Sequence, residues 1–552
     1  MRKVAGDPEC PEGPEGRRFC GASGKPEELE DLGDPVIHEG PVEDYGRHEP
    51  RGAPYGLGGT SCEPRGTRHP VVVMADRIAD IFVDLGYRIA EGPEVEAEWF
   101  NFDALNMGEG HFARALDHTF FVADPSGPGR RSGLVLRAHT SPVQIREMLG
   151  ASPPIRMVCT GRVFRPDPVD ATHSPVFSQV EGLAVDRDLT MADLRSTLDY
   201  FASSVFGHGV VTRLRPHWFA YTEPSAEVDV ACVVCRGAPG RGSAGPCRTC
   251  GGEGWIEWGG CGMVHPRVLA TCGIDPAEYS AFAFGMGVER TLMLRHGLED
   301  MRDIVDGGVR LALGTAEPPV SSRAWPGLGL TWSQSIRRLV GRALASAGYV
   351  ETPTFPFVGG AAWDAFGLAA DDPRRETLTL VNPISPGEPA LRTTLLPGLL
   401  AALRHDVDRG RPYAGLFEQG TAFTSPFRAN PPPCLPADRP PTDGQLRALR
   451  AAIPAQPHHL AAVLAGESGW TEIVDTARTA AGIAGTGLTT RAAGHPPWLP
   501  GRCVELLAGP TVLGHAGELC SETIRALGLP PGTSAMEIDL TALEQLAEPE
   551  KA

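Results

Sequence analysis

The residues best suited to chemistry lie in one short segment, 161–182, which reads GRVFRPDPVDATHSPVFSQVEG. Arg165 and Asp167 stand two positions apart before a proline-containing turn, so in an extended strand both side chains point to the same face. An arginine placed in this way can hold a phosphate through paired hydrogen bonds, and the acid can accept a hydrogen bond from an amino group such as that of adenine.

The returning strand continues this polar face. Phe177 is suited to stacking on a base, and Gln179 and Glu181 follow at intervals of two residues. Together these groups suit a ligand with phosphate at one end and an ammonium group at the other. The alternative is an exposed hairpin with ordinary surface charges, which does not explain why so many polar and stacking groups coincide.

The composition is that of a globular protein with more than one core, because the 552 residues are 42% hydrophobic. No apolar run approaches the ~20 residues that cross a bilayer, and the N-terminus lacks the apolar stretch of a signal peptide. We therefore expect a cytoplasmic protein with no membrane segment. The net charge of -18 argues against a broadly basic surface that coats nucleic acid, although a local basic groove stays open.

The elements that must position the hairpin can be predicted from periodicity. Residues 1–66 are rich in Gly, Pro, Glu and Arg without apolar periodicity, which predicts a disordered tail. Apolar residues at helical spacing predict a helix that ends at Gly86 and runs into a strand over 87–92. A second helix is predicted from an N-cap at Thr190 to Gly207. Its buried face consists of Leu194, Leu198, Phe201 and Val205.

A linker rich in Pro, Ala and Gly over 314–327 separates a first domain, 67–313, from a second, 328–552. The second half repeats the first: SIRRLVGRALASAGYVETPTF is again an amphipathic helix that ends in Gly-Tyr before a strand, and LRTTLLP (391–397) echoes LRAHTSP (136–142). The second half lacks the paired arginine and acid of the hairpin. We infer two copies of one fold, one reactive and one degenerate, with chance similarity of two helix-to-strand units as the alternative.

Four cysteines form two CxxC pairs around a glycine-rich loop within 232–250, namely Cys232, Cys235, Cys247 and Cys250. This spacing is typical of a closed tetrahedral zinc site, which is structural because no open ligand position is implied. Two disulfides are the alternative, and a reducing compartment disfavours them.

These segments resemble the alpha subunits of bacterial phenylalanyl-tRNA synthetases, which are class II aminoacyl-tRNA synthetases. The resemblance runs from about residue 68 to 313 and includes GPEVEAEWFNFDALNM, LRAHTSPVQIREM, the hairpin, RPHWFAYTEPSAEVDV and AFAFGMGVERTLMLRHG. It implies an α+β fold with an antiparallel sheet flanked by helices, and ATP-dependent activation of phenylalanine followed by transfer to tRNA. The cysteine pairs resemble an insertion that some of these subunits carry.

The resemblance implies roles for individual residues. Arg165 matches the motif 2 arginine on the α-phosphate, and Arg290 matches the motif 3 arginine on the far phosphates. The same resemblance implies that Asp167, His173 and Phe177 bind ATP. The groups around the amino acid are His139, Ser141, Gln179 and Glu181, with Phe219, Tyr221 and Ala283 lining the pocket for its ring. It also implies Mg2+, with Glu223 at a position that binds magnesium in the family, in addition to the structural Zn2+.

The pocket departs from the family pattern. The family's FPF is Phe219-Ala220-Tyr221 here, and its GFAFG reads AFAFG over 281–285. Because a buried tyrosine hydroxyl needs a partner, one hypothesis is that the preferred substrate is a polar or substituted relative of phenylalanine. A harmless exchange of Tyr for Phe is the alternative.

Residues 328–546 resemble the catalytic-like module of the beta subunit, through LVNPISPGEPALRTTLLPGLLAALRHDVDRGRPYAGLFEQGTAF and VLGHAGELCSETIRALGLP. The family's tRNA-binding and editing modules are not recognised, so tRNA recognition is open. We expect a phenylalanine-tRNA ligase-like enzyme. The alternatives are transfer of the adenylate's aminoacyl group to a non-tRNA acceptor, and a non-catalytic regulatory paralogue. The segment around Pro93 resembles the dimer-forming motif 1, which predicts a homodimer.

Overall fold

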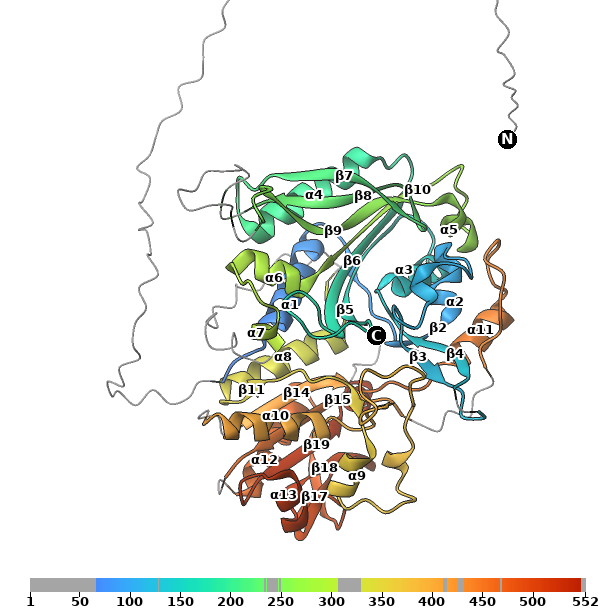
Figure 1. Cartoon of the computed structure of the whole chain (residues 1–552). Helices are drawn as coiled ribbons and strands as arrows, with labels where there is room; N and C mark the ends of the chain where they lie inside the picture. Colours follow the sequence, from blue (N-terminus) through green and yellow to red (C-terminus); the bar gives the residue numbers. More distant parts are fainter. Residues whose placement is uncertain are drawn as a thin grey trace, which may run out of the picture. The chain divides into compact units, whose positions relative to one another are not determined.

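The computed structural model describes residues 66–127, 129–232, 235, 247, 250–305, 329–410, 415–424, 431–466 and 469–547. The predicted tail, apart from residue 66, and the predicted linker over 314–327 lie outside the described residues. The described chain is a mixed α+β structure, as predicted, and is dominated by two large sheets that are mostly antiparallel (Figure 1). Among the described residues, no helix has both the length and the apolar character needed to cross a bilayer.

Seven strands form the first sheet, with one parallel pair, β1 and β5, at its edge and antiparallel pairs beyond it. In spatial order these are β1 (Arg88–Ile89), β5 (Ile155–Phe164), β6 (Val176–Asp186), β10 (Ser280–Gly287), β9 (Trp255–Val264), β8 (Thr222–Ala231) and β7 (Thr212–Phe219). A small sheet lies beside it, with β2 (Val95–Ala97), β4 (Arg131–Leu136) and β3 (Phe121–Ala123) in that order. The strand predicted over 87–92 is thus shorter than expected, because only two of its residues pair.

Helices cover the two faces of this sheet differently. One face packs on α1 (Pro70–Asp84), α4 (Met191–Phe206) and α6 (Val288–His296), and Figure 1 shows these helices together on one side. The opposite side carries α2 (Glu98–Asn101), η1 (Asp103–Leu105), η2 (Phe112–Arg114), α3 (Ser141–Gly150) and α5 (Pro266–Thr271), while α7 (Arg302–Val305) follows α6. The predicted ends of α4 are confirmed: Thr190 forms a capping box with Asp193, and Gly207 is the C-cap.

Successive side chains of a strand point to opposite faces of the sheet. This alternation decides which residues pack against α1, α4 and α6 and which lie on the opposite face. On β10, Phe282 and Phe284 enter the core under α1, α4 and α6, whereas Ala281 and Ala283 point to the opposite face. On β6, Val180 and Ala184 likewise join the helix-covered core, so Gln179 and Glu181 point to the opposite face. The polar face predicted for the hairpin is therefore the face away from α1.

The second sheet has the same kind of order, with one parallel pair, β11 and β14, followed by antiparallel pairs. Its strands are β11 (Val350–Glu351), β14 (Gly415–Thr421), β15 (His458–Leu464), β19 (Ser534–Asp539), β18 (Thr511–Leu519), β17 (Trp498–Ala508) and β16 (Thr489–Ala492). A separate pair is formed by β12 (Phe357–Val358) and β13 (Ala390–Leu391). The helices are α8 (Trp332–Ser346), α9 (Gly360–Ala365), η4 (Pro373–Arg375), α10 (Leu396–Asp408), α11 (Asp443–Ala451), α12 (Trp470–Ile483), α13 (Ser521–Leu527) and α14 (Leu540–Ala547).

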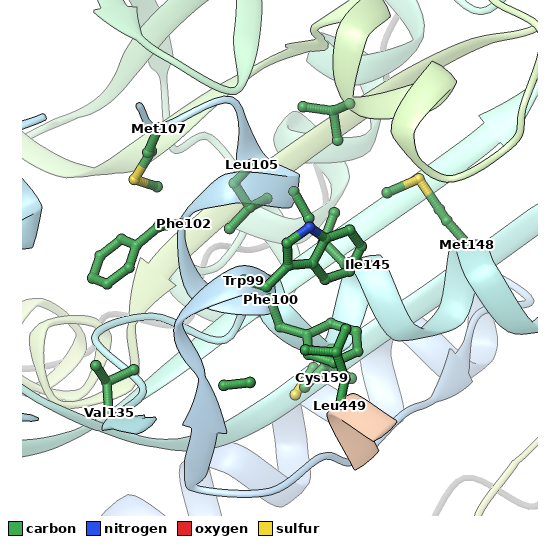
Figure 2. Close-up of a cluster of buried hydrophobic side chains, with 14 of the residues drawn as sticks. Trp99, Phe100, Phe102, Leu105, Met107, Val135, Ile145, Met148, Cys159 and Leu449 are labelled. Atoms are coloured by element: carbon green, nitrogen blue, oxygen red, sulfur yellow. The ribbon is translucent and has the colours of Figure 1, made fainter. Parts of the chain in front are cut away.

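The two halves share a hydrophobic core. The cluster around α2, α3 and the small sheet also contains residues far along the chain, namely Leu378, Leu380, Leu391, Phe423, Leu435 and Leu449. Figure 2 shows Leu449 of α11 among side chains of the first half such as Phe100 and Cys159. The Gln456 side chain adds polar contacts, since its Oε1 accepts hydrogen bonds from the backbone N–H groups of Glu94 and Val95, both at 2.8 Å. The second half therefore completes the core of the first.

We expect Leu449→Ala to lower the free energy of unfolding by about 2–5 kcal/mol, because it opens a cavity in a core drawn from both halves. Leu546→Ala is the matched control, because Leu546 is a helical leucine that is 49% exposed and should change stability by less than about 0.5 kcal/mol. Urea unfolding followed by tryptophan fluorescence measures both. Equal midpoints for the two variants would contradict a shared core.

Candidate active site

A cavity of about 390 Å³ opens on the polar face of the first sheet. Eleven residues predicted to bind ATP or the amino acid line it: Ser141, Arg165, Asp167, His173, Phe177, Gln179, Glu181, Phe219, Tyr221, Ala283 and Arg290. They come from β6, β7, β10, α6, the N-terminus of α3, the loop between β5 and β6, and the turn after β7. Residues separated by more than a hundred positions thus meet in one concave site of the size that holds a small ligand.

Two arginines, Arg165 and Arg290, line the cavity. The Arg165 Nε donates to the Ala138 carbonyl at 3.1 Å, and its guanidinium lies 5.1 Å from the centroid of the Phe177 ring. Within the described residues, no carboxylate forms an ion pair with Arg165. Burial lowers the pKa of its guanidinium. The Nε of Arg290 donates to the Glu257 carbonyl at 3.2 Å. Both cations are anchored through the backbone, which leaves charge available for an anionic ligand.

The loop of the hairpin is organised by Asp170. Its carboxylate accepts hydrogen bonds from the backbone N–H groups of Thr172 and His173, both at 2.7 Å, and lies 3.0 Å from Nδ1 of His173. These hydrogen bonds hold the pKa of Asp170 below its usual range. The Met301 N–H donates to the Ala171 carbonyl at 2.8 Å and fastens the loop to the segment before α7. The loop therefore keeps His173 at the rim of the cavity.

A buried carboxylate, that of Glu181, also lines the cavity. Glu181 is only 4% exposed and accepts hydrogen bonds from Thr140 N–H at 3.1 Å, Ser141 Oγ at 2.8 Å and Gln144 Nε2 at 2.7 Å. Burial raises the pKa of Glu181, and these donors oppose the rise. Gly285 leaves room for it, because a Cβ there would lie 3.0 Å from Gln179 Nε2 and 3.1 Å from Glu181 Cγ. An ammonium group fits beside such an acid.

Aromatic rings also line the cavity. The Phe219 and Tyr221 rings are nearly parallel, with centroids 5.6 Å apart and 15° between their planes. Phe219 lies against Gly260, where a Cβ would come within 2.8 Å of the ring. Burial raises the pKa of Tyr221, and no partner for its hydroxyl is found among the described residues. The pocket is flat-walled and apolar, with one unpaired hydroxyl.

His139 does not line this cavity, unlike the other predicted amino-acid-binding residues. It is buried with its ring centroid 6.5 Å from that of Tyr221, and burial lowers its pKa to about 3, assisted by Arg165. The imidazole is therefore neutral. Its polar neighbour is the Asn101 backbone, but neither ring nitrogen makes a well-formed hydrogen bond.

Two residues of the site were missed in the sequence. Gln144 stands three positions after Ser141, so it shares a helix face with it, and this spacing could have revealed it. Glu289 is buried in the first turn of α6 and accepts hydrogen bonds from Ser178 N–H with both oxygens, at 2.8 and 2.9 Å. Burial raises its pKa to about 7. Glu289 thus ties strand β6, beside Phe177, to the helix that carries Arg290.

The four predicted metal-binding cysteines lie together outside the cavity. Their sulfurs are all within 4.8 Å of one another, with 3.8 Å between Cys232 and Cys247 and 3.6 Å between Cys235 and Cys250. A tetrahedral zinc site with Zn–S bonds of about 2.3 Å spaces its sulfurs by about 3.8 Å, so the donor set fits Zn2+. The Gly254 N–H donates to Cys250 Sγ at 3.2 Å, which supports one side of the cluster.

Glu223 takes no part in either cluster. Its carboxylate is 75% exposed and lies 3.4 Å from Nε2 of His265. The structure therefore brings no second carboxylate to Glu223 among the described residues that could share a cation with it.

Comparisons with known proteins agree with this geometry. The family model described as tRNA synthetases class II core domain (F) matches residues 58–313, and the phenylalanyl tRNA synthetase beta chain CLM domain matches residues 319–540. The phenylalanine–tRNA ligase alpha subunit of Streptomyces coelicolor is 62% identical over 247 residues, which cover 45% of this chain and 69% of the relative. The corresponding subunit of Streptomyces avermitilis is 60% identical over 248 residues, with the same shares covered.

The subunit of the same name from Thermobifida fusca is 58% identical over 247 residues, 45% of this chain and 66% of the relative. These matches confirm the resemblance inferred from the motifs in both halves. The chain belongs to the class II tRNA synthetases, in the phenylalanine–tRNA ligase family, with an alpha-subunit core fused to a beta-chain segment.

Proposed function

We propose that this chain joins phenylalanine, or a close aromatic analogue, to ATP as an aminoacyl adenylate and transfers the aminoacyl group to tRNA. One observation carries the proposal: a single cavity is lined by two arginines, a buried acid and two nearly parallel aromatic rings. The arginines match the phosphates of ATP. The buried acid matches the ammonium group of the amino acid, and the aromatic rings match its side chain. The membership of the chain in the ligase family agrees with this assignment.

Adenylate formation needs fixed positive charge rather than a nucleophilic side chain. The carboxylate of the amino acid attacks the α-phosphorus of ATP and pyrophosphate leaves, so charge develops on the α-phosphate oxygens. Arg165 is held by the Ala138 carbonyl to oppose that charge, and Arg290 binds the departing phosphates. Phe177 stacks on adenine and Asp167 accepts from its amino group, while His173 contacts the phosphates from the rim.

The other residues hold the amino acid in line. Glu181 and Gln179 bind the ammonium group, and Ser141 orients Glu181. Neutral His139 supports the pocket from behind Tyr221. Mg2+, which class II synthetases use, compensates the charge of the phosphates when bound, and Glu257 lines the cavity where Arg290 is anchored. Glu223 is a poorer candidate ligand because it lies outside the cavity lining.

We also infer that the second domain, 328–552, is a degenerate copy of the catalytic domain, 67–313. Equivalent arginines make equivalent contacts: Arg137 Nε donates to the Arg162 carbonyl at 2.8 Å, and Arg392 Nε donates to the Thr421 carbonyl at 3.2 Å. From these two contacts, the pairing of neighbouring strands in each sheet gives the equivalent positions of the two halves. Positions equivalent to Arg165, Phe177, Glu181 and Arg290 are then Thr424, Pro457, Ala461 and Ala542. The copy has lost every one of these groups.

That two copies of this chain form a homodimer stays a prediction. The homodimer was predicted from the segment around Pro93, but the backbone next to Pro93 already hydrogen bonds to Gln456 of the same chain. Transfer to a non-tRNA acceptor is the second candidate, and the assay below separates it from the first.

We expect Arg165→Ala to lower phenylalanine-dependent pyrophosphate exchange by about 10²–10³-fold, because one fixed charge on the transition state is lost. Arg187→Ala is the control, since Arg187 is an exposed arginine of the same domain paired with Glu278. Labelled phenylalanine on bulk tRNA shows whether tRNA is the acceptor. Exchange without any charged tRNA favours the second candidate, and full exchange by the Arg165 variant contradicts the proposed site.

The unpaired hydroxyl of Tyr221 predicts a substrate preference. If it selects a polar ring substituent, pyrophosphate exchange will be faster with tyrosine or a ring-substituted analogue than with phenylalanine, and Tyr221→Phe will reverse the order. Tyr279→Phe, outside the cavity lining, should change nothing. Equal or better exchange with phenylalanine by the unmodified chain rules out the preference.

We propose that Cys232, Cys235, Cys247 and Cys250 hold one structural Zn2+ in the 232–250 insertion. Cys235→Ser should abolish the bound zinc and lower the midpoint of thermal unfolding, because three thiolates leave the site open. Cys434→Ser is the control, since Cys434 is exposed and outside the cluster. Elemental analysis of purified protein measures the metal, and equal zinc content in both variants would refute the site.

A further inference from the structure

Aromatic side chains gather beside the candidate active site, outside the pocket itself. Phe112 and Trp218 are 66% and 68% exposed, more than any other large hydrophobic side chain of the described residues. The His111 ring connects them: its centroid lies 4.6 Å from that of Phe112 and 6.3 Å from that of Trp218. His118 packs edge-on against Phe112 at 5.4 Å. We call these four residues the aromatic platform.

The platform is held in place by the chain around it. The His111 Nδ1 accepts from Ala113 N–H at 3.3 Å and caps η2, while Thr119 Oγ1 donates to the Ala113 carbonyl at 2.8 Å. Asn106 Nδ2 donates to the Ala220 carbonyl at 2.7 Å, so the loop with Phe112 is tied to the turn after Trp218. Two segments distant in sequence therefore present their rings together.

The platform borders the cavity on both segments. Leu105, at the start of the loop, and Phe219, next to Trp218, both line the cavity. Its rings are suited to stacking rather than to ion pairing, because burial and the nearby Arg114 lower the pKa of His111 and favour the neutral imidazole. A molecule that enters the cavity past these segments meets exposed aromatic rings.

We propose that the aromatic platform binds the unpaired 3′ nucleotides of the acceptor RNA by stacking on their bases. This inference rests on the proposed function, in which an RNA hydroxyl must reach the aminoacyl group inside the cavity. Bases stack on exposed aromatic side chains with about 1–3 kcal/mol per base, and every base has a face that can stack.

The test compares the full chain with Phe112→Ala/Trp218→Ala and with Tyr200→Ala, which removes a ring that is 45% exposed on α4. The probes are a phenylalanine-specific tRNA transcript and the same transcript without its unpaired 3′ nucleotides. We expect the unmodified chain and the Tyr200 variant to bind the intact transcript about tenfold more tightly than the truncated one, as one stacked base predicts. The double variant should lose this preference and keep pyrophosphate exchange.

Each outcome separates the inference from the proposed function. Absence of a preference in the unmodified chain, or its persistence in the double variant, overturns the platform, even when tRNA is charged normally. A parallel loss of pyrophosphate exchange also overturns it, because the rings then serve the amino-acid pocket. Failure of the unmodified chain to charge tRNA refutes the acceptor in the proposed function, whereas the binding comparison still decides the platform.

Discussion

Side chains alternate between the two faces of the first seven-stranded sheet, and the places of the core, the site and the helices all depend on this alternation. On β10, Phe282 and Phe284 fill one face while Ala283 and Gly285 leave the other face open. On β6, the polar residues Gln179 and Glu181 fall on that open face. A shift of one residue in register would bury the acid under α1 and expose the core residues, so packing fixes the site.

A buried carboxylate next to a helix N-terminus recurs in both halves, but on different strands. Glu181 of β6 accepts from Thr140 N–H, whereas in the second half Glu537 of β19 accepts from Leu395 N–H at 3.1 Å. In the inferred alignment Glu537 stands where the first half has Gly285. In this alignment the acid that satisfies the helix start in the second half fills the space that Gly285 keeps free in the first half.

Residues of the second half pack into the core of the first half and stabilise it. Leu449 and other residues of the second half enter the core below α2 and α3, and the Gln456 side chain bonds to the backbone near Pro93. Helix α3 supplies Ser141 and Gln144 to Glu181, and Ile145 and Met148 of the same helix belong to the shared core (Figure 2). Loss of packing there would disturb the site without any change in a residue that touches the ligand.

The sequence by itself determined the features that depend on local chemistry. Capping residues defined α4 between Thr190 and Gly207, the alternation of 161–182 predicted the polar face, and two CxxC pairs predicted the cysteine cluster. The family motifs identified eleven of the residues that line the cavity. Each of these follows from residue type and spacing within a few positions, where backbone geometry is already fixed.

Only the tertiary structure decided the remaining features, because they depend on contacts between distant segments. Glu289 acts through Ser178, and nothing near it in sequence shows that strand β6 begins beside it. His139 is absent from the cavity lining although its ring centroid is 6.5 Å from that of Tyr221. The aromatic platform exists because Asn106 joins two loops more than a hundred residues apart. Spacing along the chain cannot reveal such neighbours; the folding of the sheet brings them together.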